Sequence, residues 1–264
     1  MRPNPLRELL KAGKPSVGTH LMSTWPGIVE IAGRVGTIDY VEFVAEYAPY
    51  DLYAFENFAR AVELFDHMTA MIKVEQDPRA YVAGRAIGSG IQNVLFADVR
   101  SVADAEECVR AVRAESPRTG GRYGAADRRF AGYGLDPDKN AYVQALDDVV
   151  IALMIEKDAA VRNLEAILAV KGIDMVVFGP SDYSMSLGIP GQWGDPRLRE
   201  ARDFVYTTAL RMGVQPRAEL SGTDDAKAYL DMGIRHFAIN TDVYILRDFW
   251  QRHGDAMREA LAGR

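Results

Sequence analysis

Eight strand-like segments that alternate with helical patterns constrain the fold of this 264-residue chain more than any other feature. The segments are short and mostly apolar, and they lie at residues 16–21, 40–45, 69–74, 93–97, 149–155, 175–178, 215–218 and 236–239. Helical spacing of apolar residues fills the intervals, as in 102–114, 159–170 and 224–232. Eight strands and helices without a linker predict a (β/α)8 TIM barrel, an α/β fold that spans residues 1–264 as a single domain.

Composition and charge narrow the class of protein. Apolar residues make up 48% of the chain, which is enough for one large core. Net charge is −6, and basic residues are not clustered beyond the pair Arg128-Arg129, so we expect no nucleic-acid or membrane partner. The longest apolar runs are about seven residues, far below a membrane span, and the N-terminus lacks the apolar stretch of a signal peptide. A cytoplasmic protein is therefore expected.

Two carboxylates follow neighbouring strands in this pattern. Glu156 ends the apolar run 149–155, and Asp182 follows the run 175–178 through the turn Gly179-Pro180-Ser181. Strands of a β-α-β unit are parallel, so both acids should emerge at the same edge of the sheet. Paired acids there suit a hard divalent cation that keeps open positions for an oxygen-rich substrate.

Other interpretations of these two segments stay open. Asp and Glu often follow strands as helix N-caps, although Ser181 could cap the second helix instead. Gly179-Pro180 is either part of a substrate site or an ordinary turn. If it belongs to a site, the backbone N–H of Ser181, at the start of a helical segment, could meet a substrate carboxylate.

Active sites of such barrels lie at the C-terminal ends of the strands, and a long irregular connection such as 116–139 usually has a function. The residues predicted to gather there are His20, Glu46, Tyr47, Lys73, Asp98, Arg122, Glu156 and Asp182. Glu42 shares a strand face with Val44 and is expected to point into the barrel. A buried acid needs a partner, and the sequence does not identify one.

Three of these side chains are candidate catalytic residues. His20 is either a base at the barrel mouth or a simple hydrogen-bonding group. Tyr47 is either a general acid or base or an aromatic wall. Lys73 is expected to bind a carboxylate as a point charge, with Schiff-base formation as the alternative. The remaining histidines are expected to be structural, namely His67, His236 and His253.

Several motifs together resemble the HpcH/HpaI aldolase/citrate lyase family of class II, metal-dependent pyruvate aldolases, from about Gly18 to Asp242. They are Met154-Ile155-Glu156-Lys157 with 160–167, Gly172-Ile173-Asp174, Phe178-Gly179-Pro180-Ser181-Asp182, Ser186-Leu187-Gly188, Glu30-Ile31-Ala32 and 117–122. The resemblance implies a (β/α)8 barrel that is often a hexamer, or trimer of dimers, with the C-terminal helix exchanged between subunits. It also implies a Mg, Mn or Co ion held by Glu156 and Asp182.

The same resemblance implies that the ion chelates a pyruvyl group and stabilises its enolate. Arg122 matches a residue that meets the distal carboxylate or phosphate of the substrate, unless it is a solvated loop arginine. The chain departs from the family pattern at five positions, where an Asp, a His, an Arg, an Asp and a Pro are replaced by Val44, Tyr47, Lys73, Gly88 and Ala97. Metal chelation is thus retained while the usual His-Asp proton relay is absent.

These observations predict a divalent-metal-dependent carbon–carbon lyase, or bond-forming enzyme, that acts through the enolate of a small-molecule 2-keto acid. A decarboxylase of an oxaloacetate-like acid is the first alternative, because it needs the metal but no base for a hydroxyl group. A catalytically weakened barrel that only binds a keto acid is the second. In the absence of the relay, His20 or Tyr47 is expected to carry the proton.

Overall fold

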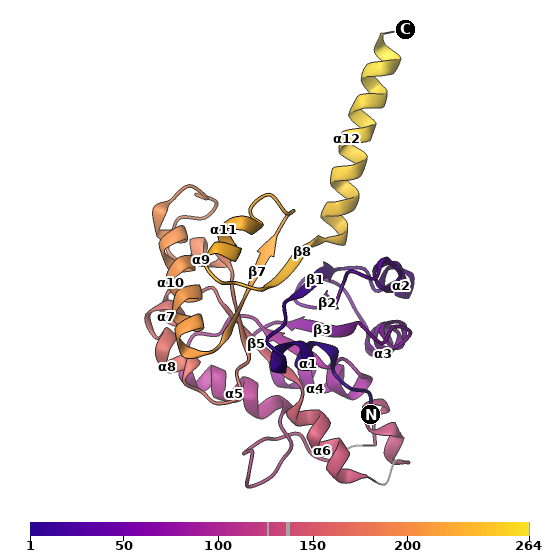
Figure 1. The fold of residues 1–264 in the computed structure, drawn as a ribbon, viewed down its shortest axis with the longest axis vertical. Coiled ribbons are helices and arrows are strands. Elements are labelled where there is room, and N and C mark those ends of the chain that lie inside the picture. The colour runs from indigo at the N-terminus through magenta and orange to yellow at the C-terminus, as the bar shows by residue number, and fades with distance from the viewer. Residues whose placement is uncertain (126, 136–137, 264) are drawn as a thin grey trace.

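Eight parallel strands close into one barrel in the computed structural model, which describes residues 1–125, 127–135 and 138–263. Each strand pairs with its sequence neighbours, and β8 closes the barrel against β1 (Figure 1). The strands are β1 Ser16–Leu21, β2 Tyr40–Val44, β3 Thr69–Val74, β4 Asn93–Phe96, β5 Val150–Ile155, β6 Met175–Phe178, β7 Gln215–Leu220 and β8 His236–Thr241. The predicted (β/α)8 barrel is confirmed.

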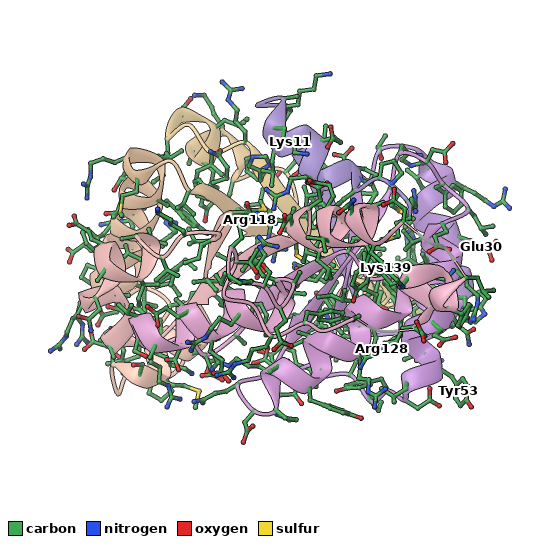
Figure 2. All side chains as sticks on the ribbon, turned by 90° about the horizontal axis from the view of Figure 1, so that it is seen from below. Lys11, Glu30, Tyr53, Arg118, Arg128 and Lys139 are labelled. Atoms are coloured by element: carbon green, nitrogen blue, oxygen red, sulfur yellow. The ribbon has the colours of Figure 1, made fainter. Side chains whose placement is uncertain are left out.

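Helices connect the strands and surround the barrel. They are α1 Pro5–Lys11, α2 Pro26–Val35, α3 Leu52–Val62, α4 Arg79–Ser89, α5 Val102–Val112, α6 Lys139–Asp147, α7 Asp158–Arg162, α8 Leu164–Leu168, α9 Pro180–Ser186, α10 Pro196–Met212, α11 Ala226–Asp231 and α12 Asp242–Ala262. Within the described part of the segment 116–139, a 3-10 helix spans Arg129–Gly134. Figure 2, seen from below, shows Arg118, Arg128 and Lys139 on the side of the molecule away from α12.

Several predicted boundaries were wrong by one or two residues. The predicted strand 215–218 continues to Leu220, because Arg217 and Glu219 point into the barrel as an ion pair and do not end the strand. The predicted helix 159–170 is two short helices, α7 and α8, which meet at Asn163 outside the helical region. Helix termini fray and depend on local caps, so periodicity alone fixes them poorly.

The inside of the barrel has an apolar part and a charged part. Leu6 of α1 is buried with Tyr40, Met71, Leu95 and other strand residues, so α1 covers one end of the barrel with apolar packing. Nearer the mouth the interior holds charged side chains, among which Arg217 is the largest fully buried one. The apolar packing at one end of the barrel thus supports the charged side chains at the mouth.

The last helix departs from the barrel pattern. Figure 1 shows α12 extending away from the strands, although it follows β8 directly. Only Asp242 at its first position is buried. Large apolar side chains are exposed along it, namely Val243, Tyr244, Ile245, Leu246, Phe249, Trp250, Met257 and Leu261. Among the described residues, no helix has the length and apolarity needed to cross a membrane.

Candidate active site at the barrel mouth

A small cavity lies where the C-terminal ends of the strands meet. It measures about 110 Å³ and is lined by His20, Met22, Glu42, Val44, Tyr47, Lys73, Glu219, Thr241 and Tyr244. These residues come from β1, β2, β3, β7 and β8 and from the segments that follow them. Because all the strands are parallel, their ends bring side chains from distant parts of the chain to one mouth.

Glu156 occupies a confined position directly after β5. Its side chain is 1% exposed, and its Oε1 accepts a hydrogen bond of 2.7 Å from the backbone N–H of Asp98. A Cβ atom at Gly179 would lie 2.6 Å from Glu156 Oε2, so glycine is required there for the carboxylate to fit. Burial raises the pKa of Glu156 to about 7, although the Asp98 hydrogen bond and Lys73 oppose the shift.

Asp98 holds this carboxylate from a backbone conformation that is rare for a residue with a side chain. Its φ angle is 55°, in the left-handed region. Non-glycine residues in this region cost free energy and cluster at functional sites. The turn after β4 aims the Asp98 N–H at the Glu156 carboxylate.

Asp182 lies on α9, after the neighbouring strand. The ammonium group of Lys157 donates a hydrogen bond of 2.7 Å to Asp182 Oδ1 and is also 2.7 Å from Asp98 Oδ1. The N-cap residues of the helices that follow these strands are Lys157 for α7 and Gly179 for α9, and neither helix has a side-chain cap. The alternative that Glu156 and Asp182 are helix N-caps is therefore wrong.

The donor set at these strand ends fits a divalent cation. Glu156 and Asp182 supply carboxylate oxygens, which Mg and Mn prefer, and a buried carboxylate with a raised pKa gains most from a nearby positive charge. Lys157 already bridges two acids of this cluster with its own charge. Sequence reasoning left Lys157 out of the site, although it directly follows Glu156.

Lys73 and Tyr47 form one wall of the mouth. Lys73 Nζ is 2.6 Å from Glu46 Oε2, donates a 3.2 Å hydrogen bond to the Tyr47 hydroxyl and lies 4.8 Å from its ring centroid. Burial alone would lower the pKa of Lys73, but Glu219 and Glu46 outweigh it and raise the pKa. A lysine held protonated is a poor amine nucleophile, so these contacts favour the point-charge role over a Schiff base.

Tyr47 is more exposed than its neighbours. Its side chain is 57% exposed at the rim, and partial burial raises its pKa to about 12. A phenol with a raised pKa transfers protons poorly near neutral pH. These contacts oppose a general acid or base role for Tyr47 and favour the aromatic wall.

His20 faces the cavity from the end of β1. Its Nδ1 lies 3.0 Å from the Asn240 carbonyl oxygen, and its Nε2 lies 3.3 Å from Glu219 Oε1 and 3.6 Å from Glu42 Oε1. Burial would lower the pKa of His20, but Glu219 and Glu42 together outweigh it and raise the pKa. The two carboxylates therefore favour the protonated form of His20.

Arg217 is the partner that Glu42 needs. Both side chains are fully buried, and Arg217 Nη1 donates to Glu42 Oε2 while Nη2 donates to Glu219 Oε1 at 2.7 Å. Sequence reasoning missed Arg217 and Glu219. Arg217 lies on the predicted strand 215–218 and Glu219 directly after it, and a spacing of two puts both on one face if the strand continues, which was the signal that could have identified them.

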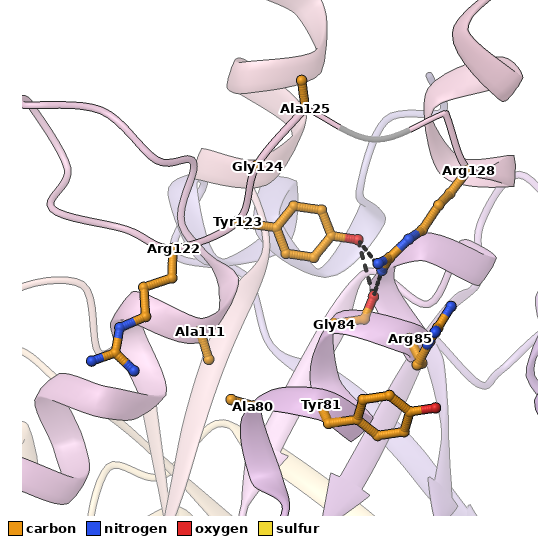
Figure 3. Close-up of a pocket in the computed structure, with 10 residues that line it drawn as sticks. All are labelled: Ala80, Tyr81, Gly84, Arg85, Ala111, Arg122, Tyr123, Gly124, Ala125 and Arg128. Carbon is orange, nitrogen blue, oxygen red and sulfur yellow. Dashed lines mark hydrogen bonds between the residues drawn. The ribbon is translucent and has the colours of Figure 1, made fainter.

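Arg122 lies outside the mouth cavity. It lines another pocket of about 440 Å³, between α4, α5 and the segment after α5, with two more arginines and two tyrosines (Figure 3). In that pocket Arg128 donates hydrogen bonds to the Gly84 carbonyl and the Tyr123 hydroxyl. The substrate-binding role of Arg122 stays a prediction, and within one subunit it does not join His20 or Lys73.

The remaining predicted residues lie as follows. Gly179 contacts Glu156, and Pro180 lines a cavity of about 240 Å³ that shares Glu219 with the mouth. The Ser181 carbonyl accepts a hydrogen bond from Ser184 Oγ. His236 begins β8 at the other end of the barrel, beside Ser16, and burial lowers its pKa to about 4. His67 contacts Phe65 and His253 contacts Phe249, both outside the mouth cavity.

Comparisons with known proteins agree with this geometry. The model of the HpcH/HpaI aldolase/citrate lyase family matches residues 26–248. A 5-keto-4-deoxy-D-glucarate aldolase of Klebsiella pneumoniae subsp. pneumoniae is 27% identical over 258 residues, which cover 97% of this chain and 98% of the relative. A solved HpcH/HpaI aldolase from Desulfitobacterium hafniense DCB-2 is 29% identical, with a TM-score of 0.85 and 96% of each chain covered.

A more distant structure shares the fold alone. The citrate lyase beta subunit from M. tuberculosis, complexed with oxaloacetate and magnesium, is 12% identical, with a TM-score of 0.58 over 88% of this chain and 93% of that one.

Proposed function

The chain belongs to the HpcH/HpaI aldolase/citrate lyase family, and we propose that it is a divalent-metal-dependent carbon–carbon lyase that acts through the enolate of a pyruvate-type 2-keto acid. The observation that carries this proposal is the Glu156 carboxylate, buried at the mouth beside Asp182 with a pKa raised to about 7. A carboxylate in that state is poised to receive a cation. The decarboxylase and the binding-only barrel remain the alternatives.

The residues at the barrel mouth would have different roles in such a reaction. A divalent ion held by Glu156 and Asp182 would supply positive charge to the oxygen of an enolate, worth several kcal/mol, roughly, of barrier lowering. Lys73 would bind the substrate carboxylate as a fixed cation, since its ammonium is already oriented by Glu46. Gly179 leaves room for Glu156, and Tyr47 would limit the access of water from the rim.

The relatives suggest a first substrate to test. A 5-keto-4-deoxy-D-glucarate aldolase is similar to this chain along nearly its whole length. Cleavage of that acid between its methylene and hydroxyl-bearing carbons gives pyruvate and tartronate semialdehyde. Both halves of the substrate carry a carboxylate, and the Lys73 ammonium on the mouth cavity suits one of them.

Purified protein with Mg or Mn is expected to release pyruvate from 5-keto-4-deoxy-D-glucarate, and excess chelator is expected to stop the release. Coupled oxidation of NADH by lactate dehydrogenase measures pyruvate directly. CO2 release from oxaloacetate without any aldol cleavage would favour the decarboxylase. Binding of pyruvate or oxalate with neither reaction would favour the binding-only barrel.

We also propose that α12 docks on a second copy of the chain in a homo-oligomer, a hexamer or trimer of dimers. The helix carries a row of exposed apolar side chains and leaves the barrel without covering it. On the outside of β8, Phe237 and Ile239 remain half-buried. Beyond the first residues of α12, its apolar side chains are left exposed by the described part of the chain, and association would bury this surface.

Trp250→Glu is expected to reduce the assembly to smaller species, because it places a charge in the apolar face of α12. Light scattering after size exclusion measures the particle mass against the 29.2 kDa chain. Gln251→Glu is the matched control, since Gln251 already bonds to a polar neighbour, Asp255. Equal masses for wild type and Trp250→Glu would contradict the proposed docking.

A further inference from the structure

Among the described residues, two buried polar atoms at the mouth cavity lack a well-aligned hydrogen bond, although both lie within ion-pairing distance of a charged neighbour. They are His20 Nε2 and Glu42 Oε1, on side chains from residues that are 8% and 0% exposed. Both residues line the cavity of about 110 Å³. An orphaned buried donor or acceptor is costly, so such atoms mark a place where a ligand group is expected. A hydroxyl group fits, because it can donate to one of these atoms and accept from the other.

The orientation of His20 is fixed by its other nitrogen. The Asn240 carbonyl only accepts hydrogen bonds, so His20 Nδ1, 3.0 Å away, must carry a hydrogen. Nε2 is then the atom that gains or loses a proton. Asn240 has a φ angle of 52°, and the pairing of β1 with β8 shifts register between Gly18 and His20. A shift of this kind re-aims a side chain, and here it directs the imidazole into the mouth.

Carboxylates and cations from three strands set the charge state of this imidazole. Glu219 of β7 and Glu42 of β2 face Nε2, and Arg217 donates to both carboxylates. Lys73 of β3 lies on the same cavity and interacts electrostatically with Glu219. Tyr244 completes the lining from α12. The two carboxylates favour the imidazolium form of His20. Arg217 binds both carboxylates and holds them in their orientation toward His20.

A second metal ion is a weaker interpretation of the same cluster. The nearest ligand atoms of His20, Glu42 and Glu219 lie within 4.8 Å of one another, which a cation could span. Arg217, however, is fully buried and already binds Glu42 and Glu219, the latter through the oxygen nearest to His20. Adding a divalent ion beside a buried guanidinium would bring like charges together at low dielectric.

We propose that His20 is the proton carrier of the carbon–carbon lyase reaction and that Glu219, Glu42 and Arg217 are its positioning residues. The inference rests on the function proposed above and supplies the proton transfer for which the usual His-Asp relay is missing. The position is new relative to that relay, since it is built on β1 and β7 and uses neither Val44 nor Tyr47.

Proton transfer and carbon–carbon cleavage need no reactant other than the substrate and water. In cleavage, Nε2 of neutral His20 takes the proton of the substrate hydroxyl, the carbon that bore it becomes a carbonyl, and the adjacent carbon–carbon bond breaks. Its electron pair forms the enolate of the keto acid, the enolate carbon takes a proton from solvent, and His20 releases the hydroxyl proton to solvent. Bond formation is the reverse, in which the imidazolium protonates the new alkoxide.

If His20 carries the proton, the rates of cleavage and of bond formation depend on pH in opposite ways. Since neighbouring carboxylates raise the pKa of His20, the imidazolium prevails below that pKa and the neutral form above it. Turnover in cleavage should therefore rise as pH rises through the pKa of His20, and turnover in bond formation should fall there. Glu219→Gln removes a stabilising charge and should move both limbs to lower pH.

The experiment compares two reactions of each variant in Mn-loaded protein. In the cleavage of 5-keto-4-deoxy-D-glucarate, His20→Gln is expected to lower kcat by roughly 10²-fold or more with little change in KM. Oxaloacetate decarboxylation has no hydroxyl proton to remove, so His20→Gln should retain it within a few-fold. His236→Gln, a change of a buried histidine at the other end of the barrel, is the matched control and should alter the rate of neither reaction.

Other results of these experiments would contradict the role of His20, the role of Glu219 or the proposed function itself. Equal cleavage rates for His20→Gln and wild type would exclude His20 as the carrier, and a parallel loss of both reactions would assign it a structural role. Unchanged pH limbs in Glu219→Gln would exclude Glu219 as its partner. Binding of two Mn ions by wild type but one by His20→Gln would establish a metal site instead. If wild type decarboxylates but does not cleave, the proton-carrier role fails while the enolate chemistry stands; if it catalyses neither, the proposed function itself fails.

Discussion

Glu156→Gln and Asp182→Asn are each expected to lower turnover by at least about 10³-fold and to weaken Mn binding strongly. The loss follows from the several kcal/mol that a metal contributes to enolate formation, since each 1.36 kcal/mol is tenfold in rate. Both substitutions keep the shape of the side chain and remove its charge. Because burial already raises the pKa of Glu156, a neutral isostere should fit its position without loss of stability.

Isothermal titration with Mn and the pyruvate assay measure the two effects, and circular dichroism checks the fold. Asp158→Asn is the matched control, because Asp158 lies two residues from Glu156 but pairs with Arg162 on the surface of α7. The metal site would be refuted by a Glu156→Gln protein that binds Mn and turns over like wild type. Full wild-type activity in excess chelator would have the same meaning.

Arg217→Met is expected to reduce the free energy of unfolding by about 3–5 kcal/mol. The variant leaves the fully buried Glu42 carboxylate without its guanidinium partner, and a poorly compensated buried charge costs far more than the pair contributes. Glu42→Leu combined with Arg217→Met should recover much of the loss, because apolar groups then replace both charges.

Urea unfolding of the two single variants and the double variant forms a thermodynamic cycle that isolates the coupling between Glu42 and Arg217. Arg211→Met is the control, since Arg211 pairs with Glu165 on an exposed surface and should change stability by no more than about 1 kcal/mol. A loss for Arg217→Met as small as that of the control would mean that the pair does not hold the barrel mouth together.

Local sequence patterns were sufficient to predict most of the fold. Strand-forming runs and helical spacing are properties of neighbouring residues, so eight β-α units could be read directly from the chain. The positions of Glu156 and Asp182 at adjacent strand ends followed from the parallel pairing that a β-α-β unit enforces. The ends of β7 and the break between α7 and α8 did not follow, because they depend on tertiary contacts and on caps.

The pairing of charges was the main part that could not be predicted. Glu42 and Arg217 are 175 positions apart, and Glu219 meets His20 across the join between the two ends of the barrel. Lys157 follows Glu156 in the chain, yet its ammonium group reaches Asp98 and Asp182. Nothing in local spacing specifies which of several charged strand residues will meet inside a closed barrel.

The sequence by itself determined the barrel, the edge of the sheet at which Glu156 and Asp182 lie, and the departure from the His-Asp pair of the family pattern. It could do so because periodicity, strand direction and residue identity are encoded locally. Only the tertiary structure decided that Arg217 neutralises Glu42, that Glu219 and Asn240 fix the charge and orientation of His20, and that α12 leaves the barrel uncovered. Electrostatic partners and solvent exposure depend on distances between segments remote in the chain, and those distances exist only once the barrel has closed.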